Sequence, residues 1–448
     1  MTRSRTSGAV TAPFNRQELI DTFTIFLRGA VSDVPADGQR AWTPRPLMLT
    51  ALLMAWGAED SLEQRFVAAV QCLADLYPTR KRPGKTFSGY ASAMDQLGPR
   101  VRRHTAAHLR DQVQEAAGER WRIGQWVVVG CDGSRFEVPR TAANEQALAP
   151  GAREGAMPQA WVTTLLHLPT GLALGWRIGA GDSSERAHVR QMIRLLPQKT
   201  MLVADAGFTG YDLWKQLIDA GHGFLIRVGA NVKLLRKLGY CVKEKGDDGI
   251  VYLWPDDQRR AGQPPLILRL VRVHDGRREM CLVTNVLDRA QLSDAELVQM
   301  YKLRWGVEVW FRDTKQTLGR TKLRSRTPGR AKQELHWVLL AVTLLGLMGV
   351  RALGAAGEDP LRLSFAQVMH TVRGLCRRPD RRMKRGQTLA KLLSRALTDT
   401  YVRRGPKSTR PYPRKKPNDG PPGVPKVRDA SRAQVQAALR LMSEKPAA

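Results

Sequence analysis

Hydrophobic positions in the first quarter of the chain recur at helical spacing. Leu62, Phe66 and Leu73, for example, fall on one side of a helix with about 3.6 residues per turn. Asn15 precedes an earlier run of the same kind and is a candidate helix cap. We therefore predict a helical N-terminal domain over residues 1–120, whose basic loop, TRKRPGK, suits DNA binding.

Beyond this domain the pattern changes to short apolar runs, which are typical of strands. WVVVGCD and TMLVAD are continuous apolar runs that end at Asp132 and Asp205, as buried strands do. Residues 160–168 and 172–179 flank Pro-Thr-Gly and predict a hairpin. Further strand-like runs fill residues 223–286, so an α/β domain is expected here.

The last third of the chain returns to helical patterns and ends in a basic tail. Ser293 or Asp294 caps a predicted long helix that ends at Gly319, and a strongly apolar helix follows. That apolar run is too short to span a bilayer comfortably, so we interpret it as a buried core helix. We predict that the α/β domain covers 121–350. A basic C-terminal region, 351–448, would follow, with a disordered tail rich in Pro, Lys and Arg from about 403.

The charge of the chain indicates a polyanionic partner. There are 72 Lys and Arg against 41 Asp and Glu, a formal net charge of +31, and an excess of this size favours nucleic acid. An anionic membrane surface, or a surface charged for solubility, are the alternatives. The five cysteines are scattered without a C-x-x-C pair, which fits a reducing compartment. The opening residues lack the apolar run of a secretory signal, so we expect a cytoplasmic protein without membrane contact.

The sequence YKLRWGVEVWFRDTKQTLG places several functional groups on one side of the predicted long helix. Tyr301, Arg304, Glu308 and Lys315 fall within roughly 60° of one another at about 100° per residue, and Arg312 lies near the same face. Such spacing is also typical of a solvated face with salt bridges. The two acidic residues at the ends of upstream strands favour a shared site instead, because strand ends converge.

The spacing Tyr301-x2-Arg304-x3-Glu308-x6-Lys315 resembles the YREK signature of IS4-type transposases of bacterial insertion sequences. The surrounding segments resemble that family too. They are CDGSRFEVPRTAANEQAL, DAGFTGYDLWKQL, LVTNVLD, and FRDTKQTLG followed by LRSRTPGRAKQEL. The resemblance covers about residues 75–350, and its motifs occur in the family's order.

This resemblance implies a DDE-type transposase with an RNase H-like catalytic core. Asp132, Asp205 and Glu308 would then be the catalytic and metal-binding carboxylates, and a β-rich insertion, about 223–286, would separate the last two. An all-oxygen site suits two Mg²⁺ or Mn²⁺ ions rather than Zn²⁺. Such an enzyme cleaves the phosphodiester backbone at transposon ends and joins the 3′ hydroxyl to target DNA.

The same resemblance implies the DNA contacts and the partners. Tyr301, Arg304 and Lys315 would hold phosphates of the transposon end, with Arg312 as a further candidate. The expected partners are terminal inverted repeats, target DNA and a second copy of the chain in a synaptic complex, which places the protein at the nucleoid. A metal-dependent nuclease or resolvase on the same core, and an inactive DNA-binding derivative, remain open as alternatives.

Four positions near these motifs bear on the details. Ala206 stands in DAGF, where the family more often has an arginine. Met280 stands where certain relatives have an aromatic residue that receives a flipped base, so the use of a DNA hairpin is left open. Trp305 and Trp310 could stack on bases, but we expect both to pack in the core.

Overall fold

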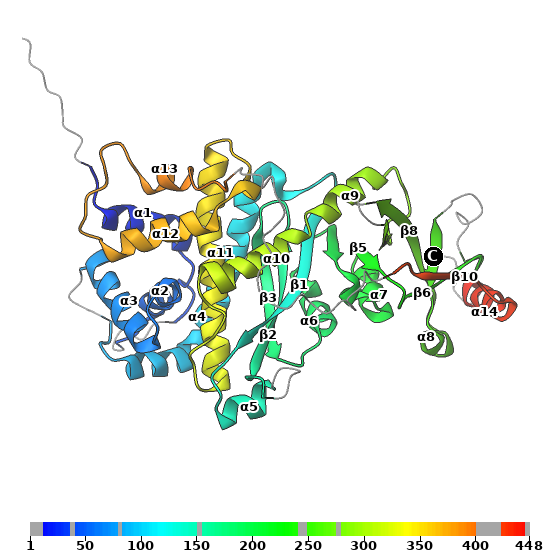
Figure 1. Cartoon of the computed structure of the whole chain (residues 1–448), viewed down its shortest axis with the longest axis horizontal. Helices are drawn as coiled ribbons and strands as arrows, with labels where there is room; N and C mark the ends of the chain where they lie inside the picture. Colours follow the sequence, from blue (N-terminus) through cyan, green and yellow to red (C-terminus); the bar gives the residue numbers. More distant parts are fainter. Residues whose placement is uncertain are drawn as a thin grey trace, which may run out of the picture.

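A ten-stranded sheet runs from the middle of the elongated molecule to one end, and the longest helices are gathered at the other end (Figure 1). This computed structural model describes residues 12–35, 41–78, 83–149, 155–240, 249–274, 279–399 and 423–443. The chain is thus a mixed α/β protein, as the alternation of helical and strand-like patterns predicts.

The helical end is built from both halves of the chain. Its helices are α1 (Asn15–Leu27), α2 (Pro44–Trp56), α3 (Leu62–Leu76), α4 (Phe87–Ala117), α11 (Pro328–Ala355), α12 (Phe365–Arg377) and α13 (Leu389–Leu393). α11 packs against α2 and α4, and α12 packs against α1. The predicted N-terminal helices are confirmed, but helices from the predicted C-terminal region complete their core. Asn15 does not cap α1: it lies inside the helix, and its side chain donates a hydrogen bond to the Arg378 carbonyl.

α11 is long and apolar enough to cross a membrane by length and composition alone, and it is the one such helix among the described residues. Most of its apolar window is buried inside the protein, because the helix passes between α2, α4 and α12. The interpretation of this segment as a core helix is therefore confirmed.

The sheet has the strand order β10-β6-β7-β8-β9-β5-β4-β1-β2-β3. Its strands are β1 (Val127–Glu137), β2 (Gln159–His167), β3 (Leu172–Ala180), β4 (Thr200–Ala204), β5 (Gly223–Val228), β6 (Lys233–Arg236), β7 (Ile250–Leu253), β8 (Leu266–His274), β9 (Glu279–Thr284) and β10 (Lys426–Asp429). β1 pairs in parallel with β4, and β4 in parallel with β5. β2 pairs antiparallel with β1 and with β3, so the predicted hairpin is confirmed.

The strands predicted between 223 and 286 do not form a separate sheet. The first of them, β5, lies beside β4, and β9, β8, β7 and β6 follow it outward in the same sheet. The pattern of apolar residues within a strand does not show which strands pair with each other, so the sequence could not predict that these strands extend the same sheet. Short helices α5 (Ala142–Leu148), α6 (Glu185–Met192), α7 (Tyr211–Asp219) and α8 (Asp256–Arg260) connect the strands.

The predicted disordered tail is ordered at its far end. β10 pairs in parallel with the edge strand β6, and α14 (Arg432–Ser443) follows it. Ala438 of α14 is fully buried in a small apolar cluster with Leu235, Tyr252 and Trp254, and this burial explains the order. Residues 400–422, which hold most of the tail's proline, lie outside the described residues.

The segment that the sequence predicts as one long helix is divided into three pieces. α9 (Asp294–Lys302) begins with a capping box in which Ser293 and Glu296 bond each other's backbone N–H. A turn at 303–304 separates it from α10 (Trp305–Arg312), and a π-helical turn, η5 (Asp313–Thr317), follows. Gly319, with φ +77°, ends the segment as predicted.

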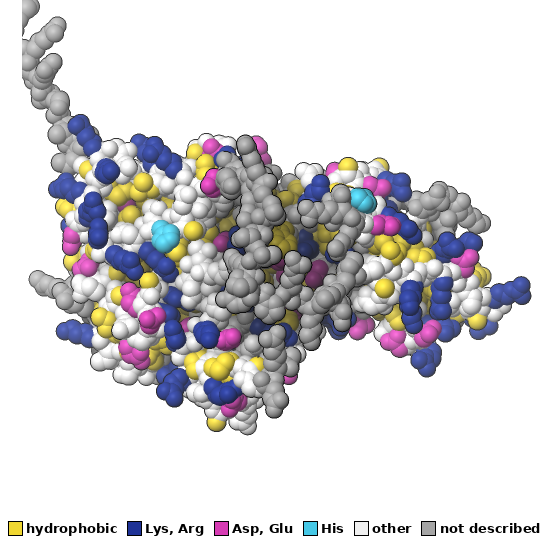
Figure 2. Space-filling model, in the orientation of Figure 1, with side chains coloured by type: hydrophobic (Ala, Val, Ile, Leu, Met, Phe, Trp, Pro, Cys, Tyr) yellow, Lys and Arg dark blue, Asp and Glu magenta, His cyan; other side chains and the backbone are white. Residues whose placement is uncertain are grey.

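Lys and Arg side chains are spread along the whole length of the face in Figure 2. Acidic side chains lie among them. Basic side chains therefore lie at both ends of this face.

Candidate active site

The two predicted aspartates lie where β1 and β4 separate. The parallel pairing of these strands ends at Gly130 and Val203. Asp132 follows on β1, which continues to Glu137 beside β2 rather than ending at Asp132. Asp205 comes directly after the end of β4 and caps a short 3-10 turn, η3 (Ala206–Phe208). The divergence of two neighbouring strands thus brings the two carboxylates to one end of the sheet.

Each aspartate is oriented by the backbone N–H of a nearby glycine. Oδ1 of Asp132 accepts a hydrogen bond from Gly133 N at 2.7 Å, and Oδ1 of Asp205 accepts one from Gly207 N at 2.8 Å. Both carboxylates are half-buried. These bonds fix one oxygen of each carboxylate.

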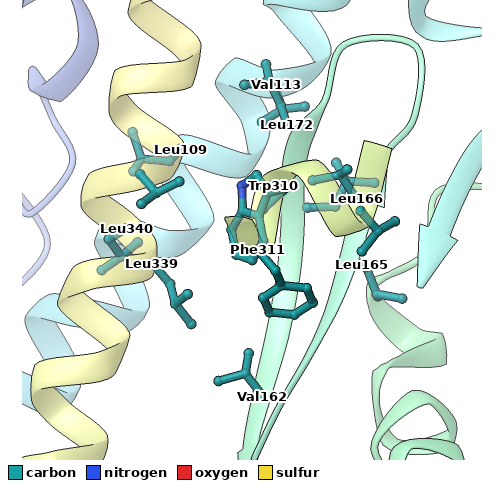
Figure 3. Packing of buried hydrophobic residues seen from close by; sticks show 14 of the residues in the cluster. Leu109, Val113, Val162, Leu165, Leu166, Leu172, Trp310, Phe311, Leu339 and Leu340 are labelled. Carbon is teal, nitrogen blue, oxygen red and sulfur yellow. The ribbon is translucent and has the colours of Figure 1, made fainter. Parts of the chain in front are cut away.

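Helix α10 carries Glu308 to the same end of the sheet. Trp310 and Phe311 of this helix are buried against β2 and α11, where Figure 3 shows them beside Leu165 and Leu339. Gly130 allows a close approach of α10 to β1, because a Cβ at this position would lie 2.8 Å from Val307 Cγ2. The apolar side of α10 therefore fixes the place of its polar side.

The remaining signature residues are distributed around Glu308. Arg304 donates from Nη2 to Glu308 Oε1 at 2.9 Å, and its guanidinium lies 5.9 Å from the centre of the Tyr301 ring. Lys315, on the π-helical turn, instead reaches β1, where its Nζ donates to Ser134 Oγ at 2.6 Å. Arg312 is exposed at the end of α10. Three of the four residues form one cluster, and Lys315 contacts Ser134, which stands two positions along β1 from Asp132.

Burial and mutual repulsion perturb the carboxylates at this site. Burial is the largest cause of the raised pKa of Asp132, which reaches about 6; Asp205 and Glu308 also raise it, while the hydrogen bond from Gly133 N and the charge of Arg304 lower it. Burial of Lys315 lowers the pKa of its ammonium. The charges of Asp205 and Glu308 thus both act on Asp132.

The sequence did not indicate one acidic residue of this site, Glu185. It is the first residue of α6, after the capping Ser184. Burial raises the pKa of Glu185 to about 7, with further contributions from Asp132 and Asp205. A glutamate in the first turn of a helix is common for electrostatic reasons alone, so the sequence offers no separate signal for it.

The carboxylates are not converged on one point. Among the described residues, no three Asp, Glu, His or Cys side chains are grouped so that they could hold a metal ion as they stand. Glu308 is turned to Arg304, and each aspartate to a glycine N–H. Like charges at low separation favour such outward bonds when no cation compensates them.

Four further positions complete the site's description. Trp310 is 6% exposed, as expected, but Trp305 is 59% exposed, so the prediction that Trp305 packs in the core is wrong. Its position at the first turn of α10 turns it away from the sheet. Met280 is half-buried on β9, and Ala206 begins η3.

Comparison with known proteins relates part of this chain to transposases. Residues 128–344 match the family described as transposase DDE domain. The transposase InsG for insertion sequence element IS4, from Escherichia coli (strain K12), is 28% identical over 254 residues. That alignment covers 54% of this chain and 56% of InsG, so the chain spans about half the length of this relative.

Among solved structures, a piggyBac transposase synaptic complex with hairpin DNA aligns over 91% of this chain and 89% of that chain. Its TM-score is 0.42 with 11% sequence identity, a likeness too distant to carry an argument. The matched domain encloses Asp132, Asp205 and Glu308 in the expected order. With the relative from element IS4, this match makes residues 128–344 similar to the DDE domain of transposases.

Proposed function

We propose that the chain is a DNA transposase that binds transposon ends, cleaves the phosphodiester backbone and joins the freed 3′ hydroxyl to target DNA. The observation that carries this proposal is the approach of Asp132, Asp205 and Glu308 from β1, the end of β4 and α10. The strand order β3-β2-β1-β4-β5, with β2 antiparallel to its neighbours, supports an RNase H-like core. In this proposal β6 to β9 are the insertion that separates Asp205 from Glu308.

The donor set fits hard divalent cations. Asp132, Asp205 and Glu308 offer only carboxylate oxygens, which Mg²⁺ and Mn²⁺ prefer. A pair of such ions, when bound, activates a water or hydroxyl nucleophile and stabilises charge on the leaving oxygen. The three residues would then hold the ions between β1 and α10.

Arg304, Tyr301 and Lys315 suit the binding of DNA phosphates. Arg304 is mostly buried, at 16% side-chain exposure, while its Glu308 partner is 35% exposed. A planar guanidinium held in this way offers further N–H donors to a phosphate. Lys315 adds a point charge at Ser134, two positions along β1 from Asp132. These residues would orient the scissile phosphate, with Arg312 as an outer contact.

The proposed partners follow from this chemistry. They are the terminal inverted repeats of the element, target DNA and a second copy of the chain in the synaptic complex. The net charge of +31 supports binding of DNA. A protein with these partners works at the nucleoid in the cytoplasm.

End cleavage and strand transfer by the purified chain test the proposal. The substrate is DNA from the borders of the element that encodes the chain, with Mg²⁺ present. Asp132→Asn, Asp205→Asn and Glu308→Gln should each abolish cleavage and keep DNA binding, because each keeps size and removes a charge. Glu145→Gln, at an exposed ion pair with Arg140, is the matched control and should behave as wild type.

The alternatives give different results in the same assay. Cleavage without joining by the wild-type chain would indicate a nuclease or resolvase. Binding without cleavage would indicate an inactive derivative. Full cleavage by any one of the three variants would remove that residue from the site.

A further inference from the structure

Glu185 reaches into the space between the two catalytic aspartates. If Gly133 carried a Cβ, that atom would lie 2.2 Å from Glu185 Oε1 and 2.9 Å from its Cδ. A Cβ on Gly207 would lie 3.8 Å from Glu185 Oε2. Gly133 follows Asp132 directly, and Gly207 donates its N–H to Asp205. The Glu185 carboxylate therefore lies against the backbone next to both aspartates.

Only glycine at position 133 leaves room for this carboxylate. The same Cβ would also meet Trp161 Nε1 at 2.5 Å. The Trp161 ring is held on the other side by Arg135, whose guanidinium lies 4.0 Å from its centre. Any other residue at 133 would have to displace Glu185, because the stacked tryptophan has little freedom to move.

Within the described part of the chain, the carboxylate of Glu185 makes no hydrogen bond or ion pair. The charge of Arg135 favours the ionised form of Glu185, but the Arg135 guanidinium stacks on Trp161 and donates from Nε to the Gly181 carbonyl at 3.1 Å. Arg304 is bonded to Glu308. Glu185, Asp132 and Asp205 thus share a small space with little positive charge among them.

The position of Glu185 at the start of α6 does not by itself explain this arrangement. A glutamate in the first turn interacts favourably with the helix dipole from any outward rotamer. An outward rotamer would also avoid the two aspartates. Its inward orientation, into a space that Gly133 keeps open, calls for a cation between the three carboxylates.

We propose that Glu185 is a fourth carboxylate ligand of the divalent ions at this site, beside Asp132, Asp205 and Glu308. This inference rests on the proposed function, since that function supplies the ions. Glu185 would approach the ions from α6, whereas Glu308 would approach them from α10, and both helices contact β1. If Glu185 is a ligand, removing its charge must lower the affinity of the protein for the metal ions.

A Mn²⁺ titration of the full-length chain, followed by electron paramagnetic resonance without DNA, tests the inference. Glu185→Gln should lower Mn²⁺ affinity by about tenfold or more, or remove one of two bound ions. Asp205→Asn should also weaken binding. Glu145→Gln removes the same charge far from the site and should bind as wild type.

Melting curves distinguish a ligand from a structural residue. In EDTA, Glu185→Gln should melt at the wild-type temperature or above it, because it removes a charge that two aspartates repel. The rise in melting temperature that Mn²⁺ gives wild type should shrink. Gly133→Ala is a second variant that keeps every carboxylate but displaces Glu185, and it should weaken Mn²⁺ binding as well.

The results separate this inference from the proposed function. Wild-type Mn²⁺ affinity in Glu185→Gln, with weakened binding in Asp205→Asn, would overturn the role of Glu185 and leave the three-carboxylate site standing. A lower melting temperature in EDTA with unchanged Mn²⁺ affinity would assign Glu185 to structure alone. A wild-type chain that binds no Mn²⁺ would overturn both proposals.

Discussion

Arg304 and Glu308 are bonded to each other across the start of α10, with Nη2 of the arginine 2.9 Å from Oε1 of the glutamate. Arg304 is the residue that precedes the first turn of α10, and Glu308 lies one turn later. Glu308 is therefore shared between a guanidinium and the proposed metal site. The pair connects phosphate binding to metal binding through one carboxylate.

Arg304→Lys tests this connection. Lysine keeps the charge but loses the planar fork, so it cannot bond Glu308 and a phosphate together in the same geometry. We expect end cleavage to fall by about tenfold or more, since small errors in position cost large factors in rate. DNA affinity in a gel-shift assay should change by no more than about twofold, because lysine keeps the positive charge at position 304 and all other basic residues are unchanged.

The matched control for this variant is Arg259→Lys. Arg259 pairs with Asp256 within the first turns of α8, away from the carboxylates. It should cleave as wild type. Equal cleavage by Arg304→Lys and wild type would show that the charge of Arg304 is sufficient and would remove the phosphate fork from the mechanism.

Ser134→Ala tests the placement of Lys315. The hydroxyl of Ser134 accepts a hydrogen bond from Lys315 Nζ at 2.6 Å, and without it the ammonium keeps its charge but loses a fixed position. We expect Ser134→Ala to reduce cleavage less than Lys315→Ala does, and both to fold. Lys215→Ala, at an ion pair with Asp219 on α7, is the control. Cleavage by Lys315→Ala at the rate of the control would assign Lys315 to packing against β1.

The sequence predicted those parts of the fold that local chemistry decides. The strand end at Asp205, the hairpin at Gly171 and the Ser293 cap depend on residues a few positions apart, and each lies near its predicted place, whereas β1 runs past Asp132 to Glu137. The family signature also indicated which carboxylates approach one another. Their approach depends on β1 and β4 separating, a feature of parallel strands that apolar runs do indicate.

Other features depend on contacts between distant segments, which periodicity does not encode. The sequence predicts a regular helix through Arg304 and Lys315. The turn at 303–304 and the π-helical turn instead bring the side chain of Lys315 to Ser134 of β1. The inward orientation of Glu185 requires the space at Gly133. The order of α14 depends on an apolar cluster contributed by β6 and β7, nearly two hundred residues earlier in the chain.

Ala438→Asp tests whether α14 is fixed to the sheet by this cluster. Ala438 is fully buried, while the next residue, Leu439, is 51% exposed. A carboxylate at 438 would be buried without a partner, so the local free energy of unfolding should fall by about 2 to 4 kcal/mol. Leu439→Asp adds the same charge to the exposed side and should cost less than about 0.5 kcal/mol.

Hydrogen exchange of the β6 and β10 amides measures this effect, since α14 is expected to detach together with its strand. Faster exchange in Ala438→Asp and unchanged exchange in Leu439→Asp are the expected results. If both variants exchanged as wild type, β10 would be held by its pairing with β6 and by the ion pairs of Asp429 with Arg236 and Lys237 alone.

His336→Asn tests the contribution of a buried histidine to stability at acid pH. Nδ1 of His336 accepts a hydrogen bond from Trp176 Nε1 at 2.9 Å, which requires the neutral ring. Burial, with Arg102 and Lys332 nearby, lowers the pKa of His336 to about 3. The unfolded chain protonates this histidine near about pH 6.5, whereas the folded chain does not. Its contribution to stability is therefore complete above about pH 6.5 and is lost as the pH falls toward about 3.

In the middle of that window the loss should approach about 1.4 kcal/mol per pH unit. Asparagine at 336 offers Oδ1 to Trp176 in place of Nδ1 but does not titrate, so urea unfolding of His336→Asn should depend less steeply on pH between about 6 and 4. His370→Asn, on the exposed side of α12, should keep the wild-type slope. The difference between the two variants isolates His336 from His167, whose pKa burial lowers to about 4 and which contributes to the slope of every variant. Parallel pH profiles for His336→Asn and wild type would mean that His336 takes up its proton without loss of the fold, and the Trp176 bond would then have no part in acid stability.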